Sequence, residues 1–137
     1  MSATGRLRWL LAVLFFGVVY VVVGRGFAAL AQLAASDERR LVWRLAAWAI
    51  SAAAFATHIY YEHVRFGSSP ATTALHASLA VGLGAFGLAA GAILHGQAVG
   101  RHFPVIALVA WPVLMALPAF AVALVAAAVL ARVRRGI

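Results

Sequence analysis

The chain has 137 residues, of which 66% are apolar and only 10% are charged; eleven are basic, three are acidic and none is Cys. A soluble domain carries about 25% charged residues, so this composition excludes an ordinary soluble globular fold. The lack of Cys excludes disulfides, thiolate metal sites and thiol nucleophiles.

Long uncharged segments dominate the sequence. Residues 9–24, 45–61, 66–100 and 102–131 contain no Asp, Glu, Lys or Arg. A helix needs about 20 mostly apolar residues to cross the hydrocarbon core of a bilayer. The sequence therefore predicts an all-α integral membrane protein: a single domain over residues 1–137, with four transmembrane helices in an up-down bundle.

The first two helices are expected over about residues 9–32 and 40–65. Trp9 is typical of a membrane interface at the start of a span. Ser36, followed by two acidic residues, is typical of a helix start and separates the two helices.

The other two helices are expected over about residues 70–96 and 104–132. Gly67 and Pro70 indicate a turn before the third helix, with Pro70 as its first residue. The fourth helix contains two internal prolines, Pro112 and Pro118, at which kinks are expected.

The basic residues are all Arg, and they flank the expected spans. In a four-span topology, the termini and the 66–70 turn share a side with six Arg, against three on the other side, or five with Arg25 and Arg44 included. The positive-inside rule then predicts both termini in the cytoplasm, in the cytoplasmic (inner) membrane of a bacterium. Basic residues at span ends do not form a nucleic-acid-binding face. The expected partners are the lipid bilayer and other membrane subunits or further copies of the chain.

A single polar stripe runs along the second helix. At 100° per residue, four other polar residues fall within about 40° of His58, and they are Arg44, Ser51, Glu62 and Arg65. Lipid cannot satisfy such a stripe, so it is expected to face the bundle interior or a partner.

The third helix presents a face of small residues that includes Gly84, Gly87 and Gly91, on the same side as His76. Small residues let helices approach closely in membranes, so these glycines and Ser51 are expected at helix contacts between the second and third helices. His58 and His76 both lie about 10 Å from the intervening turn, at 1.5 Å per residue, and are expected at matching height.

Several kinds of chemistry fit this constellation. His58, Glu62 and His76 are residue types that bind metal ions. His58 and His76 could ligate haem b, with Arg65 near the propionates, or line a quinone site. A His and Glu pair also suits a proton path. The simpler interpretation is that these groups satisfy one another, at about 0.6–2 kcal/mol per interhelical bond.

The favoured functional hypothesis is a small, non-enzymatic accessory or scaffold subunit of a larger membrane assembly, with a polar cluster between the second and third helices. The alternative is a haem- or quinone-linked electron carrier that uses His58 and His76. A second alternative is a small proton-coupled transporter. No catalytic residue is assigned.

Overall fold

The computed structural model describes residues 3–98 and 104–135. Within them the chain folds into four α-helices: α1 (Ala3–Leu33), α2 (Asp37–Tyr60), α3 (Pro70–Ala98) and α4 (Ala107–Arg135). A five-residue π-helical turn, η1 (Tyr61–Arg65), continues α2. The described residues contain no strand, which confirms the all-helical class.

Two helices start at serine caps. The Ser36 hydroxyl accepts a hydrogen bond from the backbone N–H of Arg39 at 3.3 Å, so α2 begins at Asp37. In the same way, the Ser69 hydroxyl accepts from the backbone N–H of Thr72 at 3.2 Å, and Pro70 opens α3. These side chains satisfy N–H groups that have no partner within the helix.

The start of α4 lies three residues beyond the predicted one. Residues 104–106 form a turn in which the N–H of Ala107 donates to the carbonyl of Pro104 at 3.0 Å. The helix then continues through both Pro112 and Pro118.

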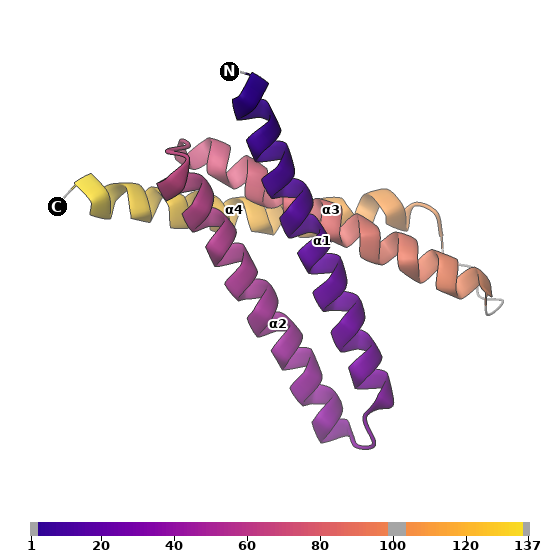
Figure 1. Ribbon diagram of the computed structural model, residues 1–137. Helices are drawn as coiled ribbons and strands as arrows, with labels where there is room; N and C mark the ends of the chain where they lie inside the picture. Colours follow the sequence, from indigo (N-terminus) through magenta and orange to yellow (C-terminus); the bar gives the residue numbers. More distant parts are fainter. Residues whose placement is uncertain (1–2, 99–103, 136–137) are drawn as a thin grey trace.

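The four helices form two antiparallel hairpins, α1–α2 and α3–α4, which cross (Figure 1). The N-terminal end of α1, the α2–α3 turn and the C-terminal end of α4 lie toward one end of the hairpins, at the upper left of Figure 1. The chain thus reverses direction at each turn, as an up-down order requires.

The expected tight pairing of α2 with α3 was wrong. These helices diverge from their turn and contact each other mainly around it, while α3 packs against α4 and α1 (Figure 1). One core joins Ile59 of α2 to alanines of α3 and α4; a second joins Val13 and Phe16 of α1 to Ala80 of α3. Both cores therefore meet at α3.

The small face of α3 explains this arrangement. A Cβ at Gly84 would lie 2.6 Å from the Cβ of Tyr20, and one at Gly87 would lie 2.5 Å from Cγ2 of Val21. Gly91 packs against the Arg25 guanidinium. The glycines let α1, rather than α2, approach the α3 backbone closely.

Three of the described helices are long and apolar enough to cross a membrane: Gly5–Leu33, Pro70–Gln97 and Ala107–Arg134. The fourth expected span, α2, does not meet this condition. Its first turns hold five charged residues and its last turns are polar, which leaves only a short apolar run between them.

Candidate functional site

The candidate site lies where α2 ends and the turn toward α3 begins. The backbone widens there into η1, in which the N–H of Phe66 donates to the carbonyl of Tyr61 at 3.2 Å. Gly67 then adopts a φ of +66°, which favours glycine, and the N–H of Ser68 bonds back to the carbonyl of Glu62 at 3.2 Å. This local fold turns Glu62 and His63 inward, and both are buried. Single π-helical turns of this kind occur frequently at functional sites.

A carboxylate flanked by two imidazoles forms the centre of the site. Oε2 of Glu62 lies 3.2 Å from Nδ1 of His76, and Oε1 lies 4.0 Å from Nε2 of His58. The Ser68 hydroxyl donates to Oε2 at 3.2 Å. His58 and Glu62 are both 0% exposed and His76 is 8% exposed, so the group is largely shielded from solvent. We call Glu62, His58, His76 and Ser68 the carboxylate cluster.

Two aromatic rings of α1 cover the imidazoles. Trp9 stacks on His76 with ring centroids 4.7 Å apart, and Phe16 stacks on His58 at 4.3 Å, both nearly parallel. Trp9 and Phe16 are seven residues apart and therefore share one face of α1. Sequence reasoning did not assign either residue to the site.

Several polar atoms of the cluster have no hydrogen-bond partner among the described residues. They are both ring nitrogens of His58, Oε1 of Glu62 and Nδ1 of His76; the buried hydroxyl of Thr73, three residues before His76, also has none. Nδ1 of His76 is close to the carboxylate but not aligned for a hydrogen bond. Leaving a buried polar atom without a hydrogen bond costs free energy. The cluster therefore retains donors and acceptors that are free to bind or exchange a proton.

The structure does bring His58, Glu62 and His76 together, but it places the other predicted site residues elsewhere. Arg65 is exposed and lines a groove of about 670 Å³ beside α1, together with Arg8. Ser51 is half-buried on α2. His63 is also buried, with Nδ1 2.9 Å from the carbonyl oxygen of Ser68.

The cluster geometry does not favour haem or metal binding. The two imidazoles approach the Glu62 carboxylate itself, and each has a ring face covered by α1. A macrocycle between His58 and His76 would have to displace that carboxylate. Within residues 3–98 and 104–135, no three His, Cys, Asp or Glu side chains are arranged to hold a metal ion.

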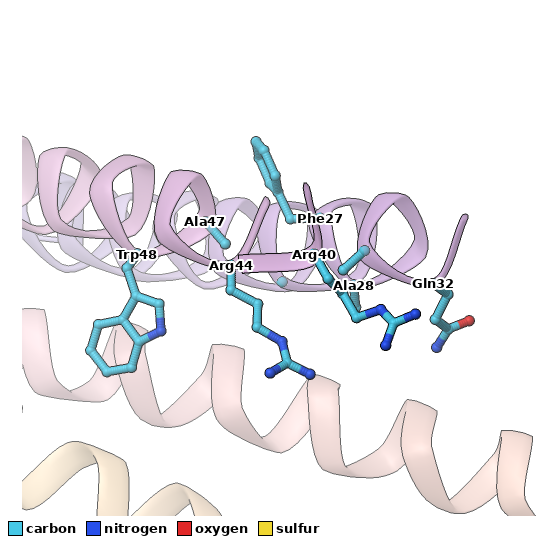
Figure 2. A pocket seen from close by; sticks show the side chains of 9 residues that line it. Phe27, Ala28, Gln32, Arg40, Arg44, Ala47 and Trp48 are labelled. Carbon is cyan, nitrogen blue, oxygen red and sulfur yellow. The ribbon is translucent and has the colours of Figure 1, made fainter. Parts of the chain in front are cut away.

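A second groove lies at the other end of the α1–α2 hairpin, between the last turns of α1 and the first turns of α2. It measures about 540 Å³, and Figure 2 shows the side chains of Gln32, Arg40, Arg44 and Trp48 projecting from it on one side. The groove is polar on this side and is lined elsewhere by small residues and Phe27.

No protein-family model, curated protein or solved structure matches this chain. Its function is therefore inferred from its own side chains and their arrangement.

Proposed function

We propose that the protein is an integral membrane protein that serves as a non-enzymatic accessory or scaffold subunit of a larger membrane assembly. The length and hydropathy of α1, α3 and α4 support insertion. Only 11% of the apolar span of α4 is buried by the rest of the chain, and large side chains such as Leu114 and Val125 point outward. Lipid is the environment that suits such a surface. The distribution of Arg supports an orientation with both termini inside, and we place the protein in the cytoplasmic membrane of a bacterium.

The subunit role is supported chiefly by the composition and packing of α2. This helix is not apolar enough to be a span in contact with lipid on all sides, yet along most of its length it packs only against α1. Its uncovered face exposes four alanines, which are Ala49, Ala52, Ala53 and Ala56. Small residues four apart are typical of close helix contacts in membranes. The outer face of α2 thus suits a neighbouring protein helix.

The carboxylate cluster has a structural role in this proposal. It joins α1, the end of α2 and the start of α3 through the two stacked ring pairs and the Glu62 contacts. Because the rest of α2 diverges from α3, this junction holds the two hairpins at their crossing point. A defined crossing keeps the alanine face of α2 uncovered for a partner.

A bulky side chain on the alanine face tests the proposal. We expect the wild-type protein, extracted in mild detergent from its own membrane, to migrate as a complex well above the 14.4 kDa of one chain. Ala53→Trp is expected to abolish that complex, because the large ring prevents close helix approach. Mass photometry and mass spectrometry of the complex measure its size and whether it holds other subunits or further copies.

Val125→Trp is the matched control, because Val125 points outward from α4 into the proposed lipid-facing surface. It is expected to leave the complex intact. A wild-type protein that is monomeric in mild detergent and in cross-linked membranes would contradict the subunit proposal.

A second candidate function, proton-coupled transport, is favoured by the unpaired Oε1 of Glu62, which lies 4.0 Å from Nε2 of His58. Two imidazoles around a buried carboxylate can exchange a proton among three sites. In liposomes loaded with a pH-sensitive dye and driven by a potassium diffusion potential, this function predicts faster internal acidification than in empty liposomes. Glu62→Gln would then return the rate to that of empty liposomes, whereas the exposed Glu38→Gln would not. Equal rates for the wild type and empty liposomes would exclude this candidate.

A further inference from the structure

The groove between the last turns of α1 and the first turns of α2 combines basic and apolar side chains. Its polar members are Gln32 from α1 and Arg40 and Arg44 from α2. Gly24, Phe27 and Ala28 of α1 form its apolar wall, and Trp48 stands at its edge, 76% exposed. We call it the arginine groove.

Both guanidinium groups of the arginine groove project on the same side. Arg40 and Arg44 are four residues apart, so they lie one above the other on α2, and Figure 2 shows them and Gln32 pointing the same way. Arg40 forms an exposed ion pair with Asp37, with Nη1 2.9 Å from Oδ1. The Asp37 carboxylate partly neutralises the positive charge of Arg40. The nearest acidic groups in the sequence, Asp37 and Glu38, lie at the hairpin end, so Arg44 carries the uncompensated charge deeper in the groove.

The charged and apolar residues of the groove lie at the depths of a lipid headgroup and of the upper acyl chain, respectively. Arg44 lies seven residues into α2, about 10 Å from the hairpin end at 1.5 Å per residue. The charged members therefore lie at headgroup depth when the hairpin end reaches the membrane surface. Gly24 of α1 and Trp48 of α2 continue the groove toward the hydrocarbon, and Trp is enriched at that boundary. A guanidinium at this depth can pair with the phosphate oxygens of an anionic lipid headgroup.

We propose that the arginine groove binds an anionic phospholipid, with Arg44 and Arg40 on the phosphodiester and Trp48 against the upper acyl chain. The guanidinium fork matches phosphate oxygens, and the Gln32 amide supplies a further donor. This inference rests on the proposed membrane insertion, but it does not depend on the subunit role.

Native mass spectrometry of the protein released from micelles tests the site, since it resolves bound lipids and the number of chains in one measurement. Phosphatidylglycerol and phosphatidylcholine with identical acyl chains are titrated separately. We expect phosphatidylglycerol to bind at least about fivefold more tightly, because one Arg near an anionic surface contributes on the order of 1 kcal/mol. Arg44→Gln is expected to remove that preference.

Arg134→Gln is the matched control, because it removes the same charge from the exposed end of α4, and it should keep the preference. Equal affinity for both lipids in the wild type, or an equal loss in both variants, would overturn the proposal. Displacement of phosphatidylglycerol by millimolar inorganic phosphate would also overturn it, by identifying a site for free anions. A monomer that keeps the preference would leave the lipid site standing and contradict only the subunit role.

Discussion

Replacing Glu62 with alanine is expected to lower the free energy of unfolding by on the order of 3 kcal/mol. The side chain is fully buried, its Oε2 accepts a hydrogen bond from Ser68, and it is the only acidic contact of His76 among the described residues. Its removal leaves Ser68 and both imidazoles without the carboxylate and opens a cavity between them. Unfolding in dodecylmaltoside micelles by titration with SDS, followed by tryptophan fluorescence, measures the change.

Two further variants separate the contributions of charge and packing at this position. Glu62→Gln keeps the volume and an acceptor for Ser68, so its loss is expected to be smaller than that of Glu62→Ala. Glu38→Ala removes an exposed carboxylate from the first turn of α2, where charge at a helix start contributes at most about 1 kcal/mol. A loss for Glu62→Ala no larger than for Glu38→Ala would mean that the carboxylate cluster does not hold the hairpins together.

Adding one methyl group at Gly84 is expected to destabilise the fold by about 1–3 kcal/mol, the usual range for overpacking. The new Cβ would lie 2.6 Å from the Cβ of Tyr20 and 3.4 Å from the carbonyl oxygen of Gly17. Neither atom is the end of a flexible side chain, so α1 must move away from α3. That movement also shifts Phe16 relative to His58. The same micelle unfolding assay measures Gly84→Ala.

Gly82 offers a matched control two residues earlier on α3. Its added Cβ would lie 3.5 Å from the Cβ of Ala116, which is ordinary van der Waals contact. Alanine is the better helix former, so Gly82→Ala is expected to be neutral or to stabilise the protein by up to about 1 kcal/mol. Equal effects of the two substitutions would mean that the α1–α3 crossing is looser than the structure describes.

The convergence of His58, Glu62 and His76 was within reach of sequence reasoning. The helical period places His58 and Glu62 on one face of α2, and the distance of each histidine from the 66–70 turn equalises their depth. The turn itself, with Gly67 and Pro70, is encoded locally. Arg65 was misplaced in the haem hypothesis because η1 changes the helical period after Tyr60, and its side chain is exposed beside Arg8.

The aromatic partners of the two histidines could not be obtained from local pattern alone. Trp9 and Phe16 lie in a segment that is apolar on every helix face. No periodicity therefore indicates which face of α1 contacts the carboxylate cluster. The glycines of α3 indicate only that some helix approaches closely. Whether that helix is α1 or α2 depends on the fit of Tyr20 and Val21 into the surface of α3.

The sequence by itself determined the all-helical class, three of the four predicted membrane spans, the start of α2 at Ser36 and the sharp α2–α3 turn. These features depend on composition, hydrophobic run length and hydrogen bonds between residues a few positions apart. Only the tertiary structure decided that the two hairpins cross, that α1 fills the glycine face of α3, and that Trp9 and Phe16 cover the carboxylate cluster. Those outcomes depend on the shape complementarity of side chains far apart in the chain, which residue spacing does not encode.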